Sequence, residues 1–202
     1  MRQRLLNRAR AEGDDFQALL TRYVLERFLY RLGQSDHRNR FVVKGAMLFV
    51  AWEGNLHRMT RDLDLLGFGP SAIAEVEEAI RVVLSTEVED DGLQFDVASV
   101  RGTLIREDQI YEGVRVNAEV RLGTARIRLK IDVGFGDAVT PAPVDAAFPT
   151  LLDTPPPVVR VYPKETVVAE KLQAMVLLGM LNSRMKDFYD LAHLARHPAF
   201  EG

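Results

Sequence analysis

The sequence contains no cysteine, so neither disulfide bonds nor thiolate metal sites can contribute to its stability or chemistry. This composition suits a reducing compartment, and we expect a cytoplasmic protein. No apolar run reaches the ~18 residues of a membrane-spanning helix, and no apolar signal core follows the N-terminal residues, so we expect no membrane association. The formal net charge of −3 gives no overall attraction to nucleic acid, so any RNA contact must use a local basic surface.

The 202 residues do contain enough apolar sequence for a buried core, since hydrophobic residues make up 47% and charged residues 27%. Residues 137 to 163 hold seven of the nine prolines, which cannot continue a helix or a central strand. We therefore expect a sheet-bearing domain over residues 1–136, a proline-rich connector over 137–162 that wraps the surface, and a C-terminal helical part over 163–202 that completes the active site.

The stretch that organises the chain is residues 58–66, in which Leu63 separates Asp62 from Asp64 and Leu65 follows. On a strand, side chains alternate between faces, so the leucines point one way and both carboxylates the other. The two acids then lie roughly 6.5–7 Å apart along the strand, close enough to share divalent metal. A strand with one solvated face gives the same alternation, so the pattern alone leaves both interpretations open.

Helices and a glycine turn are expected before and after this stretch. Apolar periodicity predicts a helix that begins at Asp14 or Asp15 and ends at Gly33, and another that Ser71 could cap. Residues 41–52 indicate a short strand, a turn at Gly45 and a short apolar helix. Gly45 would let the backbone approach a phosphate beside free helix N–H groups, or it serves only as a strand-to-helix turn.

Residues 114–133 carry a strong hairpin signal, with apolar residues at every second position on both sides of a turn at Gly123. The polar positions of the second strand are Arg126, Arg128, Lys130 and finally Asp132. A solvated face explains the cations. Alternatively, Asp132 at the end of this basic row is a third metal ligand, and the cations beside it bind phosphate.

Two C-terminal helices are expected, from about residue 163 to 180 and from about 182 onwards. Lys171 lies at the centre of an apolar face of the first, so its ammonium either snorkels to water or carries a function such as reaching a triphosphate. Asp187 shares one side of the second helix with other charged residues, where a salt-bridged surface is the simpler interpretation. Both residues lie eight positions from Gly179, so an antiparallel helix hairpin would bring them together, facing the Asp62/Asp64 strand across a cleft.

Four segments together resemble the AbiEii toxin family of nucleotidyltransferases, which includes the MenT toxins. They are FVVKGA at residues 41–46, RMTRDLD at 58–64, VYPKETVVAEKL at 161–172 and RMKDFYDL at 184–191. The superfamily fingerprint is a strand, a Gly-Gly or Gly-Ser turn, a helix, an Asp-x-Asp strand and a third acid on a later strand. The resemblance spans residues 41–195, and the two late segments are the specific ones.

The resemblance implies an α+β fold, with a nucleotidyltransferase-like mixed sheet, flanking helices and a mostly helical C-terminal part. It implies that Asp62 and Asp64 hold Mg²⁺, with Asp132 as the candidate third ligand, and that Lys171 and Asp187 are the other catalytic residues. The implied nucleotide-binding residues are Lys44, Gly45, Ala46, Arg58, Thr60 and Arg184. Ala46 departs from the family turn, so only backbone donors remain there.

These implications predict a Mg²⁺-dependent nucleotidyltransferase toxin that moves NMP from an NTP to an RNA end, with the tRNA 3′ end as the acceptor and a cognate antitoxin as its partner. The alternatives are NMP transfer to a protein side chain, and a non-catalytic nucleotide-binding module that keeps the fold without turnover. Family members usually continue with further helices beyond residue 195, so the chain looks like a short version.

Overall fold

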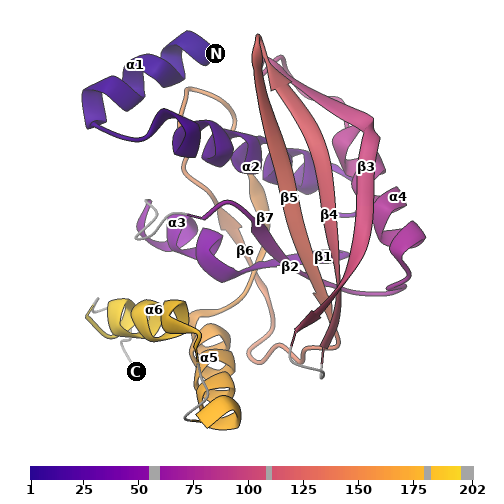
Figure 1. The fold of residues 1–202 in the computed structure, drawn as a ribbon, viewed down its shortest axis with the longest axis vertical. Helices are drawn as coiled ribbons and strands as arrows, with labels where there is room; N and C mark the ends of the chain where they lie inside the picture. Colours follow the sequence, from indigo (N-terminus) through magenta and orange to yellow (C-terminus); the bar gives the residue numbers. More distant parts are fainter. Residues whose placement is uncertain (55–59, 108–110, 180–182, 197–202) are drawn as a thin grey trace.

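The structure is a computed structural model, and it describes residues 1–54, 60–107, 111–179 and 183–196 (Figure 1). Its strands are β1 (Phe41–Lys44), β2 (Leu63–Gly67), β3 (Leu93–Glu107), β4 (Tyr111–Leu122), β5 (Ala125–Phe135), β6 (Val144–Ala147) and β7 (Val158–Val161). Its helices are α1 (Arg2–Glu12), α2 (Phe16–Gln34), the 3₁₀ turn η1 (Gly45–Met47), α3 (Leu48–Glu53), α4 (Ile73–Leu84), α5 (Lys164–Leu178) and α6 (Met185–Arg196).

The strands form one mixed seven-stranded sheet in the order β3-β4-β5-β2-β1-β7-β6. β2 pairs parallel with β5 and antiparallel with β1, while β1 pairs parallel with β7. The expected hairpin is confirmed, because β4 and β5 pair antiparallel from Leu122 opposite Ala125 at the tip to Gly113 opposite Gly134. The expected α+β architecture is also confirmed, with α5 and α6 following the sheet (Figure 1).

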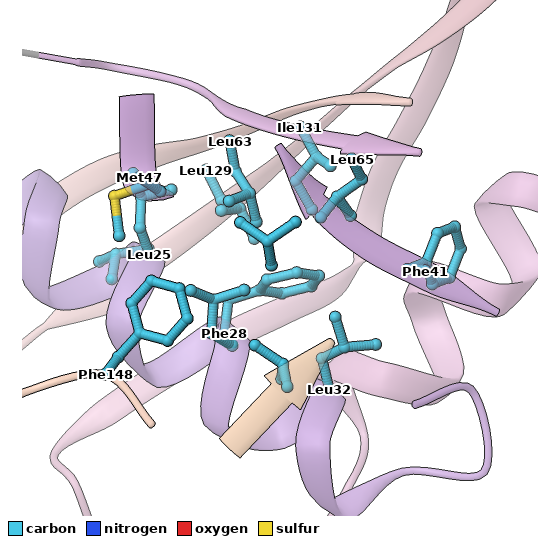
Figure 2. Packing of buried hydrophobic residues seen from close by; sticks show 14 of the residues in the cluster. Leu25, Phe28, Leu32, Phe41, Met47, Leu63, Leu65, Leu129, Ile131 and Phe148 are labelled. Carbon is cyan, nitrogen blue, oxygen red and sulfur yellow. The ribbon is translucent and has the colours of Figure 1, made fainter. Parts of the chain in front are cut away.

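The core lies between the sheet and α2, which contacts both β5 and β7. Figure 2 shows side chains of α2, including Phe28, packed against apolar side chains of β2 and β5. α4 covers β3 and contacts α2, and its apolar face is buried as its periodicity predicted. The apolar sides of β2 and β5 therefore face this core, which turns their alternating polar side chains to the opposite face of the sheet.

The helix expected from Asp15 is α2, and the Asp15 carboxylate caps it by accepting a hydrogen bond from the Ala18 N–H at 2.7 Å. The helix ends at Gln34, one residue after the expected end at Gly33, and its C-cap is Ser35. A Cβ at Gly33 would lie 2.6 Å from the Val158 carbonyl oxygen. Glycine is therefore required there for the close approach of β7, and it does not end the helix.

The proline-rich segment differs from the expected surface connector. It carries β6 and β7, and β7 joins the sheet beside β1. Phe148 and Val159 of this segment are 1% and 0% exposed, so part of it belongs to the core. Prolines precede and follow these short strands without interrupting them, which explains why composition concealed the pairing. None of the helices in the described parts of the chain is long and apolar enough to cross a membrane.

Glu26 of α2 is a buried carboxyl, 3% exposed, that accepts one hydrogen bond from the Leu151 N–H at 2.8 Å. Burial raises its pKa to about 7. The unfolded chain titrates this group near ~4.3, so between those two values the folded state binds more protons and stability falls as pH rises. We expect Glu26→Gln to be more stable than the parent at pH 8, by up to about 3 kcal/mol, with the advantage shrinking towards pH 4.5.

Urea unfolding at pH 5 and pH 8 measures this effect. Glu87→Gln is the matched control, because Glu87 is exposed, and it should follow the parent at both pH values. An advantage of Glu26→Gln that is the same at pH 5 and pH 8 would contradict the prediction.

Candidate active site

Three carboxylates gather on the polar face where β2 and β5 pair. Leu63 and Leu65 are both 0% exposed on the core side, so Asp62 and Asp64 project to the opposite face. Asp64 is the register partner of Asp132 on β5. The structure thus brings together the two acids of the Asp-x-Asp stretch and the acid that ends the basic row of the hairpin.

Asp62 lies just before β2 and is held by hydrogen bonds from two directions. Lys130 Nζ donates to its Oδ2 at 2.9 Å, and the Thr60 hydroxyl lies 3.0 Å from its Oδ1. Burial opposes the charge of this carboxylate, but these hydrogen bonds outweigh burial and lower its pKa below the ordinary value. The charge of Lys186 on α6 lowers the pKa further, so α6 lies within electrostatic range of Asp62.

Asp132 is bound by an arginine. Arg115 on β4 donates to both of its oxygens, from Nε at 2.8 Å and from Nη2 at 2.7 Å. Lys130 Nζ lies 3.9 Å from the same carboxylate. These two cations stand beside the carboxylates on neighbouring strands, where they can contact phosphate oxygens or hold the acids in place.

The backbone of Gly45 lies directly against the Asp64 carboxylate. It has a φ of +73°, a left-handed conformation that favours glycine, and a Cβ built there would lie 2.8 Å from the Asp64 Cγ. Ala46 follows in η1 and is 2% exposed. Lys44 precedes the turn and is the register partner of Asp64 on β1. The turn therefore sets the position of the Asp64 carboxylate directly.

Gly45→Ala should disturb Asp64 more than it disturbs the fold. The positive φ costs about 1–2 kcal/mol for a residue with a Cβ, and the new methyl group also displaces the Asp64 carboxylate. Gly13→Ala is the matched control, because Gly13 has a φ of +74° with nothing within 4 Å of a built Cβ. Thermal unfolding and nucleotidyl transfer are measured for both variants. We expect Gly45→Ala to lose at least as much stability as Gly13→Ala, because it adds the clash with Asp64. Only Gly45→Ala should lose activity tenfold or more, which corresponds to a barrier higher by about 1.4 kcal/mol. Equal activity of the two variants would contradict this role for Gly45.

Lys44 anchors an ionic cluster that sequence reasoning missed. Its Nζ lies 2.7 Å from Asp137 Oδ2 and 3.7 Å from Glu170 Oε2 on α5. Burial would lower the pKa of Lys44, but Glu170 and Asp137 outweigh it and raise the pKa. Burial in turn raises the pKa of Glu170. No local pattern marked Asp137 or Glu170, although Glu170 is adjacent to the singled-out Lys171.

Lys171 is held by two carboxylates of α6. Its Nζ lies 2.6 Å from Asp187 Oδ1 and 2.9 Å from Asp190 Oδ2. The lysine side chain is 12% exposed, and those of Asp187 and Asp190 are 7% and 0% exposed. Arg184 Nε lies 2.7 Å from the second oxygen of Asp187. Lys171 and Asp187 are therefore paired as expected, and the alternative of a snorkelling lysine is wrong, but α6 crosses α5 in Figure 1 and does not run antiparallel to it.

Asp187 was read most simply as part of a salt-bridged surface, and its burial contradicts that interpretation. The sequence places Asp190 on the same side of the helix as Arg184 and Asp187, three residues after Asp187, but Asp190 was not among the expected catalytic residues. That spacing was the available signal.

α5 and α6 reach the rest of the molecule through other side chains. Glu170 contacts the end of β1 through Lys44. His193 of α6 lies 2.7 Å from Glu53 and stacks edge-on against Phe49 of α3. Lys171 itself points to α6. Glu170 pairs with Lys44 at the end of β1, and the charge of Lys186 lowers the pKa of Asp62, so both side chains lie near the end of the sheet that carries the carboxylates. Arg58, expected near the phosphates, lies outside the described residues.

The donor set suits a hard divalent cation in part. Mg²⁺ in phosphate-transfer sites is commonly bound by one or two carboxylates together with substrate phosphates, which Asp62 and Asp64 can provide. Asp132 is next to them but engaged with Arg115. Over residues 1–54, 60–107, 111–179 and 183–196, no three His, Cys, Asp or Glu side chains form a ready-made metal site.

Comparison with known proteins identifies one matching family and two solved structures with a similar fold. The family model described as “Nucleotidyl transferase AbiEii toxin, Type IV TA system” matches residues 27–201. A candidate nucleotidyltransferase from H. pylori has a similar fold, with a TM-score of 0.55 and 18% identity over 90% of this chain and 69% of that chain. JHP933 from Helicobacter pylori has a TM-score of 0.54 and 17% identity over 90% and 67%. At these identities the likeness concerns the fold alone. No curated protein matches the chain significantly.

Proposed function

The chain belongs to the AbiEii family of nucleotidyl transferase toxins from type IV toxin–antitoxin systems, and on that premise we propose that it transfers NMP from an NTP to an RNA end. The proposed acceptor is the 3′ end of tRNA, and the proposed cofactor is Mg²⁺. The family implies an antitoxin as the biological counterpart of the protein. The observation that carries the proposal is the group of Asp62, Asp64 and Asp132 on one polar face, with cations directly beside it.

Nucleotidyl transfer needs alignment and charge neutralisation more than a covalent nucleophile. Asp62 and Asp64 would hold the metal, and Asp132 would either join them or keep Arg115 in place. A bound Mg²⁺ would supply charge neutralisation at the phosphates and help to activate the attacking hydroxyl. Lys130 and Arg115, now paired with carboxylates, are close enough to exchange those partners for phosphate oxygens.

The turn at Gly45 and the Thr60 hydroxyl flank the same face, which supports their proposed contact with the nucleotide phosphates. Lys44 would add positive charge at the end of β1. Asp137 and Glu170 would keep that ammonium charged and oriented until the triphosphate arrives.

We retain the proposal that residues 163–202 complete the active site of the sheet-bearing part. Asp187 would hold Lys171 in place, and Arg184 would contact phosphate from the start of α6. The contact of Glu170 with Lys44 and the effect of Lys186 on Asp62 support a position of both helices at the carboxylate end of the sheet.

The test incubates the purified protein with Mg²⁺, each of the four α-labelled NTPs, total cellular RNA and total cellular protein. Label should appear in RNA of tRNA size, be released by 3′-exonuclease digestion, and depend on Mg²⁺. Label in protein bands instead would replace the RNA acceptor with a protein side chain. NTP binding without any pyrophosphate release would favour the non-catalytic module.

A further inference from the structure

The polar face of the β4–β5 hairpin carries a row of cations that extends from the nucleotide site towards the hairpin tip. We call Arg121, Arg126, Arg128 and Lys130 the basic track. Arg121 and Arg126 are register partners next to the hairpin tip, and Arg128 and Lys130 follow along β5 towards Asp132. In Figure 1 the tip of this hairpin lies at the opposite end of the view from α5.

The track and the carboxylates share one face of the sheet. Ile127, Leu129 and Ile131 alternate with the track residues and are at most 4% exposed on the core side. The track side chains must then point to the face of Asp132, and the contact of Lys130 with Asp62 confirms this direction. Alternate residues on β5 are spaced by roughly 6.5–7 Å, so the row from Arg126 through Arg128 and Lys130 to Asp132 spans about 20 Å.

The outer part of the track is available for a ligand. Arg121, Arg126 and Arg128 are exposed, and none of them has an ion-pair partner within the part of the chain that the structure describes. The inner end differs, because Lys130 is paired with Asp62. Glu119 and Asp96 lie on the same face and reduce its charge, yet the arginines and Lys130 outnumber them.

We propose that the basic track binds the phosphate backbone of the RNA acceptor and leads its end to Asp62 and Asp64. This proposal rests on the proposed function, because it assumes an RNA acceptor. Arginine forks match phosphate oxygens, and a chain with a net charge of −3 needs such a local concentration of cations to hold a polyanion. A track of about 20 Å suits the extended last few nucleotides of a strand.

We expect the basic track to bind RNA phosphates without selecting a base sequence. The outward positions of β4 and β5 between Arg115 and Lys130 carry no aromatic side chain on which a base could stack. Contacts there would go to phosphates, which fix the register of a strand without selecting bases. Loss of the arginines should therefore weaken binding of all RNA sequences to a similar degree.

The test compares Arg126→Gln/Arg128→Gln with Arg2→Gln/Arg10→Gln, which removes the same charge from exposed positions of α1. Binding of fluorescein-labelled total tRNA and of an unrelated single-stranded RNA is measured by anisotropy from 50 to 300 mM salt. We expect the track variant to bind both RNAs roughly tenfold more weakly, with a salt slope smaller by about 1.4, and the control variant to match the parent. Binding of NTP with Mg²⁺ should be unchanged in both variants.

Equal RNA affinity and equal salt slopes for the two variants would overturn the track and leave the nucleotidyl transfer intact. Failure of the proposed function looks different, because the parent protein would then bind no RNA or would label protein in place of RNA. A track variant that loses both NTP binding and RNA binding would also overturn the proposal, since the arginines would then belong to the nucleotide site.

Discussion

Asp64→Asn is expected to lower nucleotidyl transfer by about 10²–10³-fold or more while the protein stays folded. Asparagine keeps the shape of the side chain but removes the charge that Mg²⁺ and the triphosphate require. The neighbouring turn at Gly45 is already shaped around this side chain, so an isosteric replacement introduces no clash. Transfer of α-labelled NMP to RNA and thermal unfolding are measured side by side.

Asp145→Asn is the control for this prediction, because Asp145 is an exposed carboxylate on β6 that pairs with Arg38 far along the sheet from β5. It should keep full activity. A fully active Asp64→Asn protein would contradict the assignment of Asp64 as a metal ligand, whatever its stability.

Lys171→Met is expected to abolish transfer, and the structure indicates that it also lowers the stability of the fold. From the sequence, methionine should preserve the apolar packing and fold as well as the parent. The ammonium in fact neutralises Asp187 and the fully buried Asp190. Removing one partner of such a cluster leaves an uncompensated buried charge and costs about 3–5 kcal/mol.

A second variant separates stability from chemistry. Lys171→Met/Asp190→Asn removes one charge of each sign and leaves Asp187 paired with Arg184. We expect it to recover most of the stability lost by Lys171→Met, as measured by urea unfolding, and still to transfer no NMP. Recovery of both stability and transfer would show that Lys171 only joins α5 to α6. Weakened NTP binding by the refolded double variant would support its role at the triphosphate.

The parts of this fold that followed from the sequence are those that a short repeat determines. The alternation of Asp62 and Asp64 with leucines required a strand with both acids on one face, and the hairpin followed from two alternating runs around Gly123. The pairing of Lys171 with Asp187 was expected from their equal distances to Gly179, although α5 and α6 cross in Figure 1 and do not form the antiparallel hairpin behind that expectation.

The remaining features depend on contacts between residues far apart in the chain. The pairing of β7 with β1 lies in a segment whose prolines concealed it, and the role of Gly33 depends on that same strand. Asp137 and Glu170 converge on Lys44 from two different segments, so no local spacing could connect them. The contact of Arg115 with Asp132 was not among the expected ones, although the turn at Gly123 and Thr124 pairs Leu122 with Ala125 and so places Arg115 opposite Asp132.

The most direct test of the account compares NTP labelled on the α-phosphate with NTP labelled on the γ-phosphate, using the parent protein, Mg²⁺ and purified tRNA. Nucleotidyl transfer predicts that only the α-label enters RNA, with one pyrophosphate released for each nucleotide added, and that Asp64→Asn transfers neither label. Transfer of the γ-label to RNA, or incorporation by Asp64→Asn at the parent rate, would contradict the central claim.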